Sequence, residues 1–369
     1  MVSRKLAPIF VFLCLLSFGS APFAQQAATR VSAGRLVEVK VPAPSLKGNL
    51  LSDPLEQNAV VYLPPGYDAS PTKRYPVVYL LHGFLSDLKA WTDGGYQGMR
   101  LDRTMDELIK SGRSREMIVV APSAKNAYLG SFYANSVVTG NWADYILRDL
   151  VSYIDANYRT IAQPESRGVA GHSMGGYGAL VLGMRHPDVF SSIYALSPCC
   201  TGMEGDFGPD NAAWSKTLHL TSKDQLKTQP RSFEEFYEIV FVALSAAFSP
   251  NPDHGPFLVD FPYQERDGHI EKNEAAYAKW KANLPLYMVN DNKDNLLKLR
   301  GIAIDIGQKE EFSSIRIAGR MLSAALAEQG IPHTFEIYAA GTHGSLIRQR
   351  VETRVFEFFS DKLSFGPDR

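Results

Sequence analysis

Short apolar runs alternate with helical repeats along the chain from about residue 30 onward. The runs 35–41 and 58–63 predict a pair of opening strands, the second of which is stopped by Pro64, Pro65 and Gly66. The runs 77–81 and 117–121 are apolar throughout, which is typical of strands buried on both faces of a sheet. Further strands are predicted at 168–170, 192–196, 301–306 and 334–338.

Helical repeats lie between and after these runs. The clearest spans 142–158, where Ile146, Leu150 and Ile154 recur every four residues. Other helices are predicted through Arg185 and at 314–328 and 346–359. Because alternating strands and helices need crossover connections, the pattern predicts an α/β sandwich: a mostly parallel sheet with helices on both faces.

Residues 201–300 break this alternation. The stretch is rich in Pro, Asp and aromatic residues, predicts helices at 233–248 and 271–282, and offers no clear strand. It has no evident core of its own, although its length would suffice for a small domain. We therefore interpret it as a largely helical insertion within a single domain that spans residues 30–369.

The composition excludes several classes of protein. Of 369 residues, 45% are hydrophobic and 21% are charged, which excludes a disordered chain. Lys and Arg number 38 against 39 Asp and Glu, so no global field attracts nucleic acid, and we expect no nucleic-acid partner. The His and Cys residues do not have the spacing of a zinc site, and we expect no metal.

The N-terminus has the pattern of an export signal at residues 1–24. Arg4 and Lys5 precede an apolar run at 6–18, which small residues follow, and we place the cleavage near Ala24. A run of about a dozen residues, broken by Pro8, is shorter than the roughly 20 that span a membrane. We therefore expect a secreted or periplasmic protein without a stable membrane span.

Two cysteines lie outside this signal, the neighbours Cys199 and Cys200. Adjacent Cα atoms are about 3.8 Å apart, whereas an unstrained disulfide needs roughly 4.4 to 6.8 Å. Two buried thiols are the favoured interpretation. A strained bridge between the two is the alternative in an oxidising compartment.

The candidate chemistry begins at Gly171-His172-Ser173-Met174-Gly175, a match to G-x-S-x-G. In this pattern a strand turns so sharply into a helix that the serine hydroxyl projects above the sheet, and the glycines prevent collisions. A predicted strand precedes the motif and a predicted helix follows it. We therefore identify Ser173 as a candidate nucleophile.

A serine nucleophile needs a base, and the base needs an acid that orients it. His343 lies in the loop after the strand 334–338, at the carboxyl edge of the sheet, and is the candidate base. His254 and His269 in the insertion are reserve candidates. Glu310 and Glu311 lie in the loop after the strand 301–306, and one of them is the candidate acid.

Two backbone N–H groups are needed to stabilise an oxyanion. One comes from the residue after the nucleophile, which is Met174. The second comes from a loop after an early strand, and His82-Gly83-Phe84 follows the buried run 77–81. We therefore nominate the N–H groups of Phe84 and Met174.

Taken together, four segments resemble the esterase D family of α/β-hydrolases. They are YLPPGY at 62–67, PVVYLLHG at 76–83, GHSMGGYGA at 171–179 and GTH at 341–343. That family includes feruloyl and acetylxylan esterases, S-formylglutathione hydrolases, enterochelin esterases and mycolyltransferases. The resemblance implies an α/β-hydrolase fold with Ser173 as nucleophile and His343 as base. It also implies Glu310 as acid, because Gly307 and Phe312 frame that position, where the family more often has Asp.

The expected protein is a secreted serine carboxylic ester hydrolase that works through an acyl-enzyme without cofactor or metal. Its expected substrate is an ester, either a small molecule or one attached to a polysaccharide, and its oligomeric state is left open. An acyltransferase with the same triad is one alternative. A non-catalytic carbohydrate-binding or interaction module on the same fold is the other.

The insertion leaves the sheet beside the nucleophile turn, so we expect it to cover the site as a lid. Trp91, Tyr133 and Trp142 are candidates for the facing wall of the substrate site. Aromatic residues of the insertion either contact the substrate or pack a local core. They are Trp214, Phe233, Phe236, Tyr237, Phe241, Phe257 and Tyr263.

Overall fold

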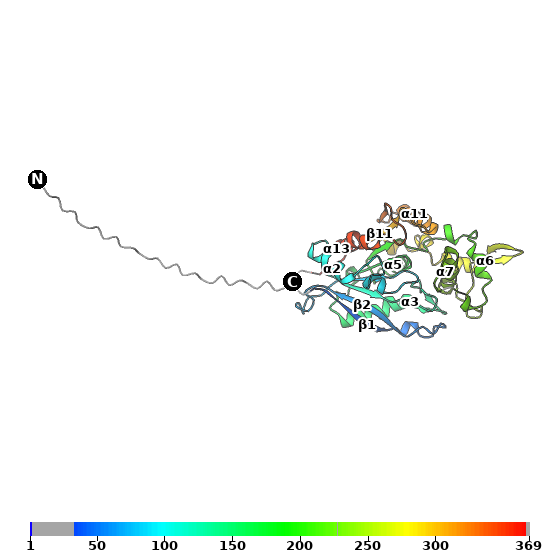
Figure 1. Ribbon diagram of the computed structural model, residues 1–369, viewed down its shortest axis with the longest axis horizontal. Coiled ribbons are helices and arrows are strands. Elements are labelled where there is room, and N and C mark those ends of the chain that lie inside the picture. Colours follow the sequence, from blue (N-terminus) through cyan, green and yellow to red (C-terminus); the bar gives the residue numbers. More distant parts are fainter. Residues whose placement is uncertain (2–32, 227, 367–369) are drawn as a thin grey trace. The chain divides into compact units, whose positions relative to one another are not determined.

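The computed structural model describes residue 1 and the ranges 33–226 and 228–366 (Figure 1). The residues described in the ranges 33–226 and 228–366 form one compact unit. The predicted export signal lies outside the described residues apart from Met1. Within the described ranges, no helix combines the length and the apolar character needed to cross a bilayer.

An eight-stranded sheet forms the centre of this unit, in the order β1-β2-β4-β3-β7-β8-β11-β12. Strand β2 is antiparallel to both of its neighbours, and all other pairs in the sheet are parallel. The predicted mostly parallel sheet is confirmed, and each of its eight predicted strands is present. The strands are β1 (Arg35–Pro42), β2 (Glu56–Leu63), β3 (Val77–Leu81), β4 (Ile118–Pro122), β7 (Arg167–His172), β8 (Ser192–Leu196), β11 (Gly301–Gly307) and β12 (Thr334–Tyr338).

Helices cover both faces of the sheet, and each face has its own apolar core. In β3, Val77, Tyr79 and Leu81 join one core, whereas Val78 and Leu80 join the other. This division follows from the alternation of side chains along a strand. It explains why the central strands are apolar at every position.

The predicted helices at 142–158 and 346–359 each form a continuous stretch that includes a π-helical part. The first core is covered by α3 (Trp142–Asp144), η2 (Tyr145–Leu150), α4 (Val151–Asn157), α5 (Met174–Arg185) and α11 (Ser313–Glu328). The second is covered by α1 (Lys89–Thr92), α2 (Leu101–Lys110), α12 (Ile347–Arg350), η6 (Val351–Val355) and α13 (Phe356–Lys362). Short 3₁₀ turns are η1 (Pro44–Leu46), η3 (Pro164–Ser166), η4 (Gly205–Phe207) and η5 (Lys223–Gln225).

The insertion runs between β8 and β11 and shares the first core. Trp214, Phe241 and Trp280 are buried there together with residues of the sheet. Helices α6 and α7 lie next to each other at one end of the unit (Figure 1). The helices of the insertion are α6 (Ala213–Leu218), α7 (Phe233–Phe248), α8 (Glu274–Lys281), α9 (Pro285–Met288) and α10 (Lys293–Leu296).

The expectation that the insertion lacks strands was wrong. Strands β9 (Tyr263–Arg266) and β10 (His269–Lys272) form an antiparallel hairpin. Its turn residues Asp267 and Gly268 both have positive φ, as a two-residue hairpin turn requires. The helix predicted from residue 271 therefore begins only at Glu274. A second small pair, β5 (Asn135–Ser136) and β6 (Gly140–Asn141), precedes α3.

Candidate active site

Ser173 occupies a sharp turn between β7 and α5. Its φ of 57° and ψ of −116° are costly for a residue with a side chain. Two glycines make the turn possible. A Cβ on Gly171 would lie 2.4 Å from the backbone of Gly175, and a Cβ on Gly175 would lie 2.2 Å from the Leu81 carbonyl oxygen. The G-x-S-x-G segment therefore forms the strand–turn–helix that its pattern predicts.

Ser173, His343 and Glu310 form a continuous chain of hydrogen bonds. Ser173 Oγ lies 2.9 Å from His343 Nε2, and His343 Nδ1 lies 3.0 Å from Glu310 Oε2. The Glu310 side chain is fully buried, and that of His343 is 17% exposed. With the proton on Nδ1, His343 donates to Glu310 and accepts from Ser173. The structure thus brings together the residues predicted as nucleophile, base and acid.

The structure also separates the two candidate acids. Glu310 contacts the imidazole ring, and its other oxygen accepts from the Phe312 N–H at 3.3 Å. Glu311 is exposed, and its Oε2 accepts from the backbone N–H of His343 at 2.7 Å. Glu311 therefore holds the loop of His343 and does not contact the ring.

The reserve histidines lie in other surroundings. His254 pairs with Asp260 at 2.9 Å, and His269 belongs to the hairpin strand β10. Neither lines the pocket that contains Ser173.

The loop after β3 is held by a buried histidine. His82 Nε2 accepts from the Ala124 N–H at 2.9 Å, so Nδ1 carries the proton and donates to the Gly83 carbonyl oxygen. The Tyr133 hydroxyl donates to the His82 carbonyl oxygen at 2.9 Å. Burial lowers the pKa of His82 to about 4, which keeps the ring neutral. These contacts fix the backbone just before Phe84.

The predicted oxyanion donors lie on either side of the nucleophile. Met174 is the first residue of α5, where N–H groups have no partner within the helix. Phe84 lines the same pocket as Ser173. Among the backbone hydrogen bonds of the described residues, none is donated by the Phe84 N–H or, outside α5, by the Met174 N–H. Both groups are therefore available to an oxyanion.

An apolar cavity of about 30 Å³ lies beside Ser173, and we call it the Ser173 pocket. This volume holds no more than a few water molecules. Its lining is dominated by aromatic rings. The lining residues are Phe84, Phe132, Ser173, Cys199, Cys200, Phe207, Phe236, Tyr237, Val240, Phe312, Ser314, Ile315 and His343.

The insertion supplies one wall of this pocket, as a lid would. Phe236 and Tyr237 of α7 line it, and Phe233 packs against Phe312 with ring centroids 5.3 Å apart. The other aromatic candidates of the insertion pack internally. Trp214 stacks on Phe241 at 3.6 Å, and Phe257 and Tyr263 are buried in the same core.

The structure does not place Trp91, Tyr133 or Trp142 in the lining of the Ser173 pocket. Trp91 packs against Tyr96 in the core on the opposite face of the sheet. Trp142 is buried, and its indole N–H donates to a backbone carbonyl. Tyr133 supports the loop of His82 instead of facing the pocket. All three rings bury their apolar surface within the fold, which corrects the prediction of a facing wall.

Sequence reasoning missed His172. Its Nε2 donates to the His343 carbonyl oxygen at 2.9 Å, and the two rings are 4.7 Å apart. Burial of the ring lowers the pKa of His172 well below its usual value, and the electrostatic effect of the nearby His343 lowers it further. The His172 ring is therefore neutral. The side chain thus supports the loop of the candidate base. Its place beside Ser173 in the motif was the available signal, but the contact joins the end of β7 to a loop residue 171 positions away.

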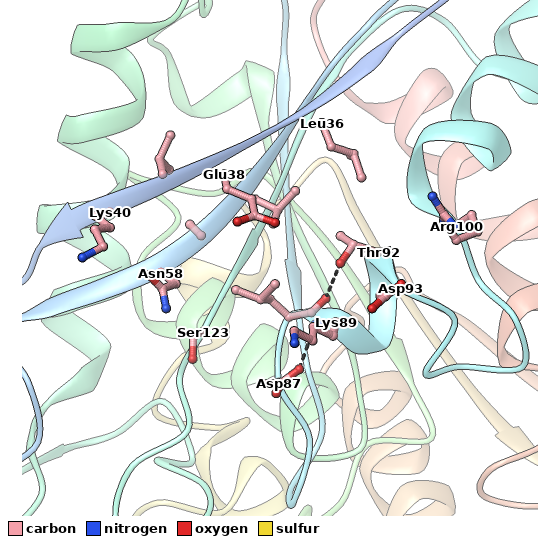
Figure 2. A pocket seen from close by; sticks show the side chains of 14 residues that line it. Leu36, Glu38, Lys40, Asn58, Asp87, Lys89, Thr92, Asp93, Arg100 and Ser123 are labelled. Atoms are coloured by element: carbon pink, nitrogen blue, oxygen red, sulfur yellow. Dashed lines mark hydrogen bonds between the residues drawn. The ribbon is translucent and has the colours of Figure 1, made fainter.

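A separate hollow of about 680 Å³ lies between β1, β2 and α1 (Figure 2). Glu38, Lys40, Asp87 and Lys89 bring charges of both signs to it. None of the candidate site residues lines this hollow. Over the ranges that the structure describes, no three His, Cys, Asp or Glu side chains are grouped so as to hold a metal ion.

The sheet order and the Ser, acid, His order along the chain define an α/β-hydrolase fold. Residues 55–346, most of the chain, match the family described as "Putative esterase". The chain belongs to this family.

Similar proteins agree with this assignment. A stretch of 142 residues is 33% identical to an endo-1,4-beta-xylanase/feruloyl esterase of Xylanibacter ruminicola and covers 36% of this chain and 18% of that protein. A stretch of 156 residues is 33% identical to Esterase MT1326 of Mycobacterium tuberculosis and covers 40% of this chain and 30% of that protein. The matches thus span less than a third of either relative. A solved ferulic acid esterase has the same fold, with a TM-score of 0.60, 19% identity and coverage of 90% of this chain and 99% of that one.

Proposed function

We propose that this protein hydrolyses carboxylic esters through an acyl-enzyme formed on Ser173. The observation that carries the proposal is the hydrogen-bonded chain from Ser173 through His343 to the buried Glu310, with the serine in a strained turn. A free serine hydroxyl is a weak nucleophile, and this chain supplies the base and the acid that activate it.

The reaction begins when Ser173 Oγ attacks the ester carbonyl carbon and His343 Nε2 takes the serine proton. Glu310 holds the imidazole in the required tautomer and stabilises the imidazolium that forms. The N–H groups of Phe84 and Met174 donate to the oxyanion of the tetrahedral intermediate. The alcohol leaves with the proton from His343, and water attacks the acyl-enzyme in the reverse sequence. These steps require no cofactor and no metal.

The Ser173 pocket supports an apolar acyl group, because aromatic rings form most of its lining. At about 30 Å³ it suits a short acyl group such as acetyl. A larger aromatic acyl group, of the kind named for the feruloyl esterase relative, requires rotation of Phe236 or Tyr237. We propose short acyl esters, free or carried on a polysaccharide, as the preferred substrates.

We also propose that the protein is exported, with cleavage near Ala24. The supporting observation is the sequence pattern of residues 1–24. N-terminal sequencing of the mature protein from the periplasm or the culture medium tests this. A mature chain that starts at residue 1 or 2 would contradict the proposal.

The catalytic proposal is tested by labelling with a fluorophosphonate and by hydrolysis of p-nitrophenyl acetate. We expect Ser173→Ala to abolish labelling and to reduce turnover by about 10⁴-fold or more. Ser152→Ala, which changes an exposed serine of α4, is the matched control and should keep both activities. Wild-type turnover in Ser173→Ala would refute the mechanism. Product analysis with added alcohols separates hydrolysis from acyl transfer.

A further inference from the structure

Two cysteines line the Ser173 pocket and take no part in the proposed ester hydrolysis. Cys199 and Cys200 are both free thiols. Their Sγ atoms are 2.8 Å apart, closer than the roughly 3.5 to 4.0 Å at which even carbon atoms pack. Only a small movement would bring the two sulfur atoms to the roughly 2.05 Å of a disulfide bond.

The backbone holds the two thiols in this arrangement. Cys200 has a φ of 54° and Ser197 a φ of 39°, both in the left-handed region. The Cys199 N–H donates to the Ser173 carbonyl oxygen at 3.2 Å, and the Ser197 N–H donates to the Asp305 carbonyl oxygen at 2.8 Å. The segment is thereby tied to the nucleophile turn and to β11, which keeps the sulfurs together.

The two thiols differ in their access to solvent. Cys200 is 1% exposed, whereas Cys199 is partly exposed. Burial raises the pKa of the Cys200 thiol well above its usual value, which makes it the weaker attacking group. A reagent that arrives from solvent therefore meets Cys199 first.

We propose that Cys199 and Cys200 are a reversible redox site, which closes to a vicinal disulfide by exchange with a small aliphatic disulfide such as oxidised glutathione. The Cys199 thiolate attacks one sulfur of the reagent, forms a mixed disulfide and releases one thiol. The Cys200 sulfur then loses its proton, attacks Cys199 Sγ and releases the second thiol. Two electrons pass to the reagent, whose halves leave as two thiols that carry the two protons.

This bond is readily reversed. Adjacent Cα atoms lie about 3.8 Å apart, below the roughly 4.4 to 6.8 Å of an unstrained bridge, and strain makes a disulfide easier to reduce. Because Cys199 and Cys200 line the Ser173 pocket, formation of this bond also depends on whether substrate occupies the pocket. Under the proposed function, on which this step rests, an acyl group in the Ser173 pocket covers Cys199 and shields it.

The first test incubates the full chain with oxidised glutathione and follows intact mass and free thiols. We expect loss of two thiols and of the mass of two hydrogens, both reversed by dithiothreitol. Peptide mapping assigns the bond, because the full chain also contains Cys14. Cys200→Ser is the matched control and should stop at a glutathione adduct on Cys199. A wild type that keeps both thiols, or that stops at a stable adduct, overturns the proposal.

A second measurement uses the wild type alone. Reduced protein should bind one equivalent of phenylarsine oxide, which bridges paired thiols, and should keep it against a monothiol. Failure to retain it overturns the proposal. Neither readout depends on Ser173, so the redox site and the proposed hydrolase can fail separately.

The coupling to substrate has its own readout. A short-chain alkyl fluorophosphonate on Ser173 should slow alkylation of Cys199 by about tenfold or more, because reaction follows exposure. Ser173→Ala treated with the same reagent is the control and should keep the rate of alkylation unchanged, because no adduct forms. Equal rates in the labelled wild type and in Ser173→Ala overturn the acyl pocket assigned under the proposed function.

Discussion

Replacing Glu310 by Gln tests the triad while the shape of the side chain is kept. Both oxygens of Glu310 are used: Oε2 faces His343 Nδ1 at 3.0 Å, and Oε1 accepts from the Phe312 N–H at 3.3 Å. A glutamine has one oxygen and one NH₂ group for these two donors. Either the Phe312 N–H or the His343 Nδ1–H must therefore face a donor.

The structure indicates which orientation of the glutamine amide is more stable. Turning the NH₂ group toward Phe312 leaves a buried N–H without an acceptor, which costs about 1 to 3 kcal/mol. Turning it toward His343 moves the ring proton to Nε2, at little cost, but that ring cannot accept the proton of Ser173. The wrong tautomer therefore dominates by about five- to hundredfold.

Loss of the negative charge beside the imidazolium adds to this effect, because the Glu310 side chain is fully buried. We expect kcat/KM to fall by about 10³- to 10⁴-fold, or about 4 to 5.5 kcal/mol. The upper value matches the effect of the corresponding acid-to-amide change in the chymotrypsin-type triad.

The assay is hydrolysis of p-nitrophenyl acetate, with a thermal melt to show that each variant is folded. Glu311→Gln is the matched control, since its amide oxygen can keep the hydrogen bond from the His343 N–H. We expect it to lose about tenfold or less, because only an exposed contact changes. Equal losses in the two variants, or a larger loss in Glu311→Gln, would refute the assignment of Glu310.

Three further outcomes follow from the structure. Gly175→Ala should lower the free energy of unfolding by about 3 kcal/mol or more, because its Cβ would lie 2.2 Å from a carbonyl oxygen. Gly344→Ala is the control: its Cβ would meet no atom within 4 Å, so this variant should melt at the same temperature as the wild type. Since burial lowers the pKa of His82 from 6.5 to about 4, the unfolded chain binds a proton that the folded protein does not. Stability should therefore fall by about 3 kcal/mol between pH 6.5 and 4, and His82→Gln should flatten that slope in pH-dependent melts. Phe236→Ala should raise kcat/KM for p-nitrophenyl butyrate relative to the acetate by about tenfold, whereas the exposed Phe233→Ala should leave the ratio unchanged.

The sheet could be predicted from the sequence because each central strand is buried on both faces. Such strands carry apolar residues at every position and stand out between helical repeats. The position of the triad follows from the same succession of parallel strands. Ser173, Glu310 and His343 each lie in a segment after a parallel strand, β7, β11 and β12, and such segments meet at one edge of the sheet. Position after a strand therefore supported Ser173 in its motif and indicated His343, but it left Glu310 and Glu311 open, and only the family resemblance favoured Glu310.

Contacts between side chains distant in sequence could not be predicted in this way. His172 has the same local context whether its ring faces solvent or the loop of His343. Trp91 and Trp142 are large rings near elements of the site, but each is buried in a core that only the packed fold defines. The hairpin of the insertion is a different case, because Asp267-Gly268 is a recognised turn signal that the helical pattern around it obscured.

The insertion shows why periodicity alone does not separate a core from a pocket. Helix α7 presents Phe236 and Tyr237 to the Ser173 pocket, while Phe241, one turn later, stacks on Trp214 with its ring nearly parallel. All three are aromatic residues at helical spacing, and what lies opposite decides their role. Because the stack anchors the same helix that forms the pocket wall, changes at Trp214 should act on stability first, and changes at Phe236 on acyl selectivity. Within one helix, the insertion therefore separates the residues that line the Ser173 pocket from those that pack the core.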